Sequence, residues 1–442
     1  MEYRLTEKNK EGIIFIDKMT VDTETMKQIR FMIKHETIEN ARIMPDCHKG
    51  NGCCIGFTSK LMGKIVPNFV GGDIGCGIVT YPLELRKPIK PKQLDRHIKE
   101  SVPLGPSVHT DTMSDIDRYM ERIYELANHD ATHFVKFYQE KFGINIYKQA
   151  PYYCQDWFHS LCERIKTNKE HDLLSLGTLG GGNHFIEVNR SDDTGTEYIT
   201  VHSGSRNLGQ KICRFHQDII TKGRDLDWDL YDKKVKQFSK VCKDKKKIKE
   251  FANSLKKEMV VNRHADYLID EEAFHYYFDM IFAQKYALVN REIMIERVIS
   301  YYNLEFDPMK KIESIHNYID FNDFVLRKGA ISAEKDKLCL IALNMRDGIL
   351  LCQGKGNENW NNSSAHGSGR IITRQKALKN KISIVKRLEK DFEKNDIYST
   401  IPLENIVDEA PECYKDTEMI KEMIGPSVKI LEQLRPVLNV KG

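Results

Sequence analysis

The spacing of hydrophobic positions changes along the chain and divides its first 300 residues into alternating strand-like and helical blocks. Residues 12–80 hold short apolar runs separated by Gly, Pro and Asp, which predicts strands and tight loops. From 89 to 172 the apolar residues recur every three or four positions, which predicts helices. Strand-like alternation returns from 173 to 205, and helical spacing follows from 208 to about 300.

The last third of the chain mixes both patterns. Strands are predicted at 324–333 and 338–354, and helices at 375–395 and 416–434. No internal repeat and no long linker divides the chain.

These patterns together predict an α+β fold. The 442 residues, 40% hydrophobic and 30% charged, are enough to bury a large core. We expect a single large domain over residues 1–442, with helical insertions at about 89–172 and 208–300. Its β-rich core would hold the candidate metal ligands described below, because they flank the helical stretches.

Composition indicates a cytoplasmic enzyme without a membrane partner. The first twenty residues are charged around one short apolar run, which predicts neither a signal peptide nor a membrane span. The eleven cysteines lack the paired spacing of a disulfide framework, so we expect reduced thiols.

The net charge of +4 is unevenly distributed. Between Lys233 and Lys257 there are eleven lysines and only two acids, Asp244 and Glu250. Such a segment is typical either of a surface that binds a polyanion or of a solvated helix face, and both interpretations remain open.

Four glycine-rich segments carry side chains that ligate metals or attack phosphorus. They are VGGDIGCGI at 70–78, LGTLGGGNHFIEV at 176–188, VHSGSRNLG at 201–209 and SAHGSGR at 364–370. Glycine removes side-chain bulk, so carboxylate, thiol and imidazole groups can approach a crowded polyanion. The pattern predicts metal-assisted phosphoryl chemistry.

The individual candidates differ in chemistry. Asp73 and Cys76 place an oxygen and a sulfur ligand within one turn, and a thiolate can bridge two ions. His184 and His202 follow in the next two segments, and each taken alone could be a structural histidine. His366 has no second metal donor beside it, so we expect it to attack phosphorus and form a phosphoramidate.

Two familiar nucleotide motifs are missing. The chain has no G-x-x-x-x-G-K-[ST] phosphate loop. Its nearest match to a lysine-x-Asp-Gly nucleotidyl-transfer motif, Met345 to Gly348, lacks the lysine.

The chain resembles the RtcB family of RNA ligases over nearly its whole length. The resemblance rests on MPDCHKGNGCCIG at 44–56, on the four glycine-rich segments in order, and on the ending Val440-Lys441-Gly442. It implies a GTP-dependent RNA ligase, active in RNA repair or tRNA splicing. Such a ligase joins RNA 3'-phosphate or 2',3'-cyclic phosphate ends to 5'-hydroxyl ends.

The resemblance also implies roles for particular residues. Two Mn(II) ions would be held per chain, one by Asp73, Cys76 and His184 and the other by Cys76, His202 and His316. His366 would be the guanylylated nucleophile. Arg206 and Arg370 would contact RNA phosphates. The expected GTP contacts are Asn183, His184, Phe185, Ile186, Glu187, His316, Asn317, Asn344, Met345, His366, Gly367, Ser368, Gly369 and Lys441.

Three departures from the family pattern predict a divergent branch. Ala342-Leu343-Asn344-Met345 stands where a Pro-Gly-Ser-Met loop is expected, and Cys47 and Gly72 replace valines. Two other functions stay open: a metal-dependent RNA phosphodiesterase or phosphatase that has lost ligation, and a noncatalytic RNA-binding relative.

Overall fold

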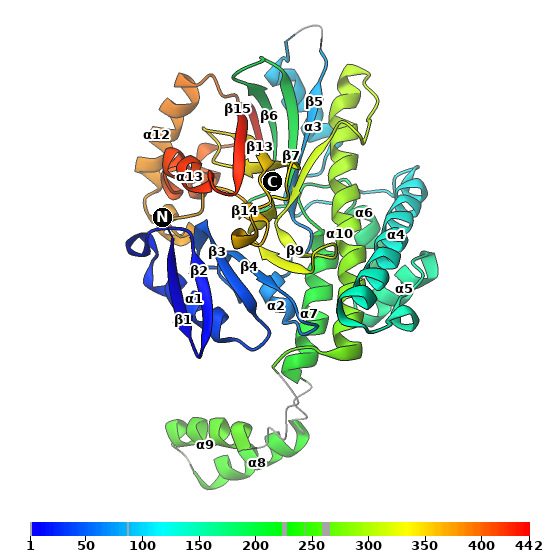
Figure 1. Ribbon diagram of the computed structural model, residues 1–442, viewed down its shortest axis with the longest axis vertical. Helices are drawn as coiled ribbons and strands as arrows, with labels where there is room; N and C mark the ends of the chain where they lie inside the picture. The colour runs from blue at the N-terminus through cyan, green and yellow to red at the C-terminus, as the bar shows by residue number, and fades with distance from the viewer. Residues whose placement is uncertain (1, 86–87, 223–227, 243, 259–265) are drawn as a thin grey trace.

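The computed structural model describes the whole chain except residues 1, 86–87, 223–227, 243 and 259–265. Figure 1 shows a body of two β-sheets with helices around them, and a separate pair of helices, α8 and α9, beyond one end.

The larger sheet has seven strands, all antiparallel, in the order β12-β13-β15-β6-β7-β5-β8. It therefore joins parts of the chain that lie far apart in sequence. Its strands are β5 (Gly77–Leu83), β6 (Phe185–Ser191), β7 (Glu197–Ser203), β8 (Ile312–Ile315), β12 (Leu338–Ala342), β13 (Ile349–Gly354) and β15 (Val428–Lys441).

The second sheet has six strands in the order β1-β2-β3-β4-β10-β9, and only β2 and β3 pair in parallel. These strands are β1 (Tyr3–Glu7), β2 (Lys10–Ile14), β3 (Glu39–His48), β4 (Ile55–Lys60), β9 (Asn317–Asp320) and β10 (Val325–Lys328). A short two-stranded sheet pairs β11 (Ala330–Ser332) with β14 (Ser363–Ala365).

Helices surround the sheets. The two ranges expected to be helical insertions hold α3 to α6 and α7 to α10. None of the helices in the described residues is long and apolar enough to cross a membrane. The helices are α1 (Thr23–Lys34), α2 (Pro67–Val70), α3 (Pro91–Ser101), α4 (Ile116–Phe142), α5 (Gln155–Arg164), α6 (Lys169–Leu174), α7 (Arg206–Lys222), α8 (Trp228–Val241), α9 (Lys245–Glu258), α10 (Asp270–Ile299), α11 (Arg374–Lys379), α12 (Lys381–Lys394) and α13 (Thr417–Ile424).

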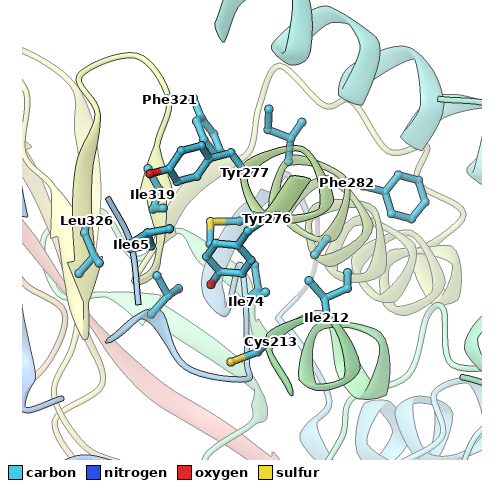
Figure 2. Packing of buried hydrophobic residues seen from close by; sticks show 14 of the residues in the cluster. Ile65, Ile74, Ile212, Cys213, Tyr276, Tyr277, Phe282, Ile319, Phe321 and Leu326 are labelled. Carbon is cyan, nitrogen blue, oxygen red and sulfur yellow. The ribbon is translucent and has the colours of Figure 1, made fainter. Parts of the chain in front are cut away.

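Helix α10 forms the centre of the main core. It is buried on nearly all sides, because it packs on α4 and α7 and also contacts strands of both large sheets. Figure 2 shows Tyr276 and Tyr277 of this helix among Ile65, Ile74 and Ile319. A helix that is apolar all round is stable only when its neighbours bury every face. The position of α10 therefore fixes the two sheets relative to each other.

The predicted α+β class with a β-rich core is confirmed. The strands predicted at 324–333 and 338–354 and the helix predicted at 375–395 are present, each interrupted once by a turn. The helix predicted at 416–434 is wrong beyond Ile424, because the next residues form β15. This strand lies between β13 and β6, where pairing on both sides outweighs local helical preference.

The prediction of strands and loops for residues 12–80 missed helix α1. Asp22 caps its first turn by accepting hydrogen bonds from the backbone N–H groups of Glu24 and Thr25. Ile29, Met32 and Ile33 then face the core at helical spacing.

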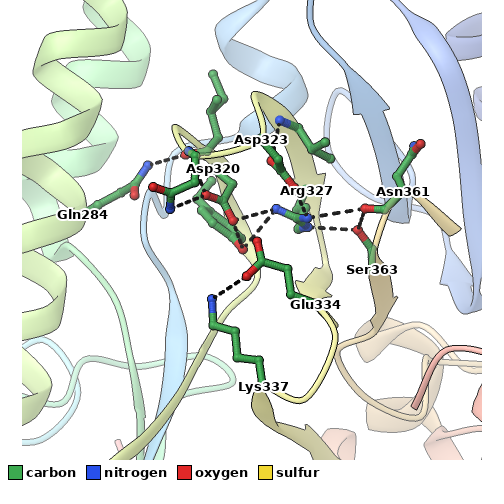
Figure 3. A network of polar contacts seen from close by, with 12 residues as sticks. Gln284, Asp320, Asp323, Arg327, Glu334, Lys337, Asn361 and Ser363 are labelled. Carbon is green, nitrogen blue, oxygen red and sulfur yellow. Dashed lines mark hydrogen bonds and ion pairs between the residues drawn. The ribbon is translucent and has the colours of Figure 1, made fainter. Parts of the chain in front are cut away.

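A buried arginine, Arg327, pairs with two of three clustered carboxylates at the edge of the six-stranded sheet (Figure 3). Oxygens of Asp320, Asp323 and Glu334 lie within 4.8 Å of one another, as in a metal site. However, the Arg327 guanidinium lies 2.9 Å from Asp320 and 2.7 Å from Asp323, and Lys337 lies 3.6 Å from Glu334. Each carboxylate of the cluster therefore already has a cationic partner, so the cluster is structural.

Replacing this arginine is expected to destabilise the fold strongly. In Arg327→Ala, the buried Asp320 and the half-buried Asp323 would lose their cation, at a cost of about 3 to 5 kcal/mol in the free energy of unfolding. The matched control Arg4→Ala removes an exposed ion pair with Glu11 and should cost about 0 to 1 kcal/mol. Urea unfolding of both variants measures the difference, and equal small losses would show that the network is not structural.

Candidate metal centre and nucleotide site

The register of the seven-stranded sheet brings four predicted metal ligands to one place. His202 lies in β7, which pairs with β6 on one side and β5 on the other, and β8 pairs with β5. His184 directly precedes β6, Cys76 directly precedes β5, and His316 directly follows β8. Because these strands are neighbours in the sheet, all four side chains lie at the same end of the strands.

The ligand atoms lie within contact distance of one another. His184 Nε2 is 3.0 Å from Asp73 Oδ2 and 3.6 Å from Cys76 Sγ. Cys76 Sγ is 3.3 Å from His202 Nε2, which is 3.2 Å from His316 Nε2. Two groups able to hold a metal ion result, and both include Cys76. They have the same members as the two sets expected from the sequence.

Hydrogen bonds orient two of the imidazoles toward this centre. Nδ1 of His184 lies 2.9 Å from the Leu179 carbonyl oxygen, and Nδ1 of His202 lies 3.0 Å from that of Asn183. A ring that donates from Nδ1 presents a lone pair at Nε2, which is the usual arrangement behind a metal ligand. His184 Nε2 and the Asp73 oxygen then face each other as two acceptors, which requires a proton or a cation between them.

Burial shifts the pKa of three ligands in this centre toward their uncharged forms. Burial and the charge of Asp73 raise the pKa of the Cys76 thiol well above its ordinary value. Burial also lowers the pKa of His202 and of His316 well below the usual range, so both rings are neutral. Neutral imidazoles bind metals, and a divalent cation would offset the cost of a buried thiolate. The donor set therefore fits a metal ion.

Arg291 of helix α10 and the glycine Gly204 help to position the metal ligands. The Arg291 guanidinium donates to the carbonyl oxygens of Gly75 and Ser203, each at 2.8 Å, and so ties the Asp73–Cys76 loop to β7. A Cβ at Gly204 would overlap the Asp73 carboxylate, so glycine lets the backbone approach this ligand.

A cavity of about 830 Å³ opens beside the metal centre, and His202 and His316 are on its wall. This volume suits a nucleotide-sized ligand. Most residues expected to contact GTP line it: Asn183, Phe185, Glu187, His316, Asn317, Asn344, Met345, His366, Gly367, Ser368, Gly369 and Lys441.

Two of the expected GTP contacts lie elsewhere. Side chains alternate along β6, so Ile186 points away from the cavity and is fully buried in a hydrophobic cluster. Its side chain is therefore not available to a nucleotide. His184 faces the metal ligands instead of the cavity.

His366 lies in the cavity wall with its imidazole oriented by a buried carboxylate. Its Nδ1 is 2.6 Å from Asp46 Oδ2, and Asp46 is fully buried. This contact leaves Nε2 as the free nitrogen. The ring centroid lies 4.8 Å from that of His316, so the proposed nucleophile adjoins the metal centre.

The loop at 342–345 supports the segment that carries His366. Ala342 donates from its backbone N–H to the His366 carbonyl oxygen at 3.0 Å, and Ser368 donates to the Ala342 carbonyl oxygen at 3.1 Å. The Asn344 side chain is used within its own turn, where it accepts from the backbone of Asp347 and donates to that carboxylate at 2.8 Å.

The two arginines expected to contact RNA have different surroundings. Arg206 donates to Thr178 Oγ1 at 3.1 Å and does not line the cavity. Arg370 lines the cavity and lies 3.1 Å from Tyr414 Oη and 3.5 Å from Glu409.

Sequence analysis missed two residues of the site. Asp46 lies in the MPDCH motif, which was noted without assigning its carboxylate a role. Glu409 lies outside any motif, yet it pairs with Lys441 at 3.6 Å and with Arg374 at 3.0 Å. Burial acts to raise the pKa of Glu409, but these cations hold it below its usual range.

The chain is similar to known proteins over nearly its whole length. The sequence profile described as tRNA-splicing ligase RtcB matches residues 28–442. The RNA-splicing ligase RtcB of Escherichia coli K12 is 27% identical over 440 residues, covering 93% of this chain and 91% of the relative. The tRNA-splicing ligase RtcB of Methanococcus maripaludis is 26% identical over 462 residues, with coverages of 90% and 87%. This chain therefore belongs to the RtcB family.

Proposed function

We propose that this protein is a GTP- and Mn(II)-dependent RNA ligase that joins 3'-phosphate or 2',3'-cyclic phosphate ends to 5'-hydroxyl ends. The names of its relatives support RNA ligation. The observation that carries the proposal is the position of His366, whose imidazole is oriented by Asp46 and adjoins a dinuclear set of metal ligands.

Two Mn(II) ions per chain are proposed for the centre. Asp73, Cys76 and His184 would hold one ion, and Cys76, His202 and His316 the other. Mixed oxygen, nitrogen and sulfur ligands suit a first-row divalent metal. When bound, such ions neutralise phosphate charge and polarise the phosphorus that is attacked.

The cavity supports the choice of GTP as co-substrate. Glu187 is buried in its wall, and burial raises the pKa of this carboxyl to about 7. A carboxylate there can accept hydrogen bonds from N–H groups, which the guanine edge offers. Lys441 lines the same cavity, with its ammonium 3.3 Å from the Gly182 carbonyl oxygen, and adds positive charge for phosphates.

For an RNA 3'-phosphate end the proposed reaction has three steps, and a 2',3'-cyclic phosphate end must first be hydrolysed by water to the 3'-phosphate. His366 Nε2 attacks the α-phosphorus of GTP, an N–P bond forms, and pyrophosphate leaves, while Asp46 stabilises the positive ring through Nδ1. An oxygen of the RNA 3'-phosphate then attacks that phosphorus and releases the imidazole. Finally the RNA 5'-hydroxyl attacks the 3'-phosphate, loses its proton, and displaces GMP.

Arg206 and Arg370 are proposed to contact RNA phosphates, and the cellular role is proposed to be RNA repair or tRNA splicing. Arg370 is the better placed of the two, because it lines the cavity. All eleven cysteines are free thiols, which supports a cytoplasmic setting.

Labelled GTP separates ligase from hydrolase chemistry. The proposal expects covalent transfer of label from the α-phosphate of GTP to the protein in the presence of Mn(II). If the protein stays unlabelled and removes or hydrolyses RNA end phosphates, the metal-dependent phosphodiesterase or phosphatase is correct instead.

The altered 342–345 loop is expected to weaken GTP use. The Asn344 amide is engaged by Asp347, so it is not free to bind a nucleotide. We expect weaker GTP use than in typical relatives, with less discrimination against other nucleoside triphosphates. Tight, strictly GTP-dependent labelling would show that the loop change has no effect.

A further inference from the structure

Helices α8 and α9 form a hairpin that stands apart from the body in Figure 1. The hairpin has an apolar seam of its own. Phe238 stacks on Phe251 with ring centroids 4.1 Å apart, and Tyr231 donates to the Ala252 carbonyl oxygen at 3.3 Å. Leu255 is buried in the same seam. The inner faces are therefore occupied, and the outer faces are left to solvent.

The outer faces of the hairpin are strongly basic. Where side chains are described, there are eight exposed lysines and only three exposed acids, a net charge of +5. Lys243 and the side chains of Asp229, Lys256, Lys257 and Glu258 lie outside the described part. The eight lysines are Lys233, Lys234, Lys236, Lys240, Lys245, Lys246, Lys247 and Lys249.

The hairpin acids whose side chains are described form no ion pair with these lysines. Asp244 instead caps α9, where its carboxylate accepts hydrogen bonds from the backbone N–H groups of Lys246 at 2.8 Å and Lys247 at 3.3 Å. Across the hairpin side chains that the structure describes, no ion pair joins one of the eight lysines to a carboxylate. The ammonium groups therefore remain available to an external polyanion.

From these contacts we propose that the α8–α9 hairpin is an RNA-binding arm that holds the phosphate backbone outside the catalytic cavity. The proposal rests on the proposed ligase function, which makes RNA the polyanion that the enzyme must hold. Closely spaced, unpaired ammonium groups bind phosphates by releasing counterions, without reading base sequence. The arm adds affinity for long RNA and takes no part in the reaction with GTP.

A neutralised arm tests the proposal. In the combined variant Lys245→Gln, Lys246→Gln and Lys247→Gln, affinity for RNA ending in a 3'-phosphate should fall roughly tenfold at low salt. The slope of log affinity against log salt should become shallower by about 2, since each phosphate contact on a single strand contributes about 0.7. Arginine at the same three positions should restore both quantities. GTP-dependent labelling of His366 should be unchanged.

A matched control separates the arm from overall charge. Gln in place of Lys8, Lys92 and Lys148, three exposed lysines on separate parts of the body, removes the same charge and should leave RNA affinity nearly unchanged. The loss in the arm variant should also disappear for RNAs too short to extend beyond the cavity.

Three results would overturn the proposal: an unchanged RNA affinity in the arm variant, an equal loss in the control, or a loss independent of RNA length. The first would leave a solvated surface or an acidic protein partner as the explanation. Failure of the wild-type protein to take label from GTP would instead overturn the proposed function, and RNA binding by the arm is measured separately from it.

Discussion

His366→Ala is expected to abolish covalent labelling of the protein by GTP while leaving metal binding intact. The imidazole offers the free Nε2 that attacks phosphorus, and no other side chain has been assigned that role. The residue lies outside both ligand groups, so metal content should stay at the wild-type value. Acid-labile GMP on the protein and metal per chain are the two quantities to measure.

The exposed histidine His159 provides the control for this prediction. His159→Ala removes an imidazole far in sequence from any predicted ligand and should label like the wild-type protein. An acid-labile GMP label that persists in His366→Ala would show that another residue is the nucleophile.

Cys76→Ser is expected to cost both metal ions. Its sulfur belongs to both ligand groups, 3.6 Å from His184 Nε2 and 3.3 Å from His202 Nε2. A serine hydroxyl is a much poorer ligand than a thiolate, and it cannot replace the bridge. Metal analysis of the purified protein after dialysis should therefore find neither ion.

Cys154→Ser is the matched control, because Cys154 is a free thiol that belongs to neither ligand group. It should retain the full metal content. If Cys76→Ser keeps both ions, the bridge is wrong, and if it loses only one, the cysteine belongs to a single site.

Asp73, Cys76, His184 and His202 could be proposed as metal ligands from sequence because each lies in a short, glycine-rich segment with distinctive chemistry. His316 lies outside these segments, and only the resemblance to the family implied its role. The order of the segments did not show how they meet, which depends on the pairing of β6, β7, β5 and β8. That pairing joins residues more than a hundred positions apart, such as Cys76 and His184. Local patterns carry no information on such contacts.

The wrong helix prediction and the side-chain positions that the sequence could not give have the same cause. The first residues of β15 were predicted to be helical from their local sequence pattern. They form a strand because β13 and β6 pair with them on either side. Ile186 belongs to the motif that supplies Glu187, yet the alternation of β6 sends the two side chains to opposite faces. Glu409 belongs to the cavity wall only because the fold brings it to the cations with which it pairs, among them Lys441 and Arg374.

The most direct test of the ligase account follows the phosphorus of an RNA end. An RNA with a labelled 3'-phosphate is incubated with a 5'-hydroxyl RNA, GTP, Mn(II) and the protein. The account predicts a joined product in which the label resists phosphatase, because it has become a 3',5'-phosphodiester. Release of the label as inorganic phosphate without any joined product would contradict the account and identify a hydrolase.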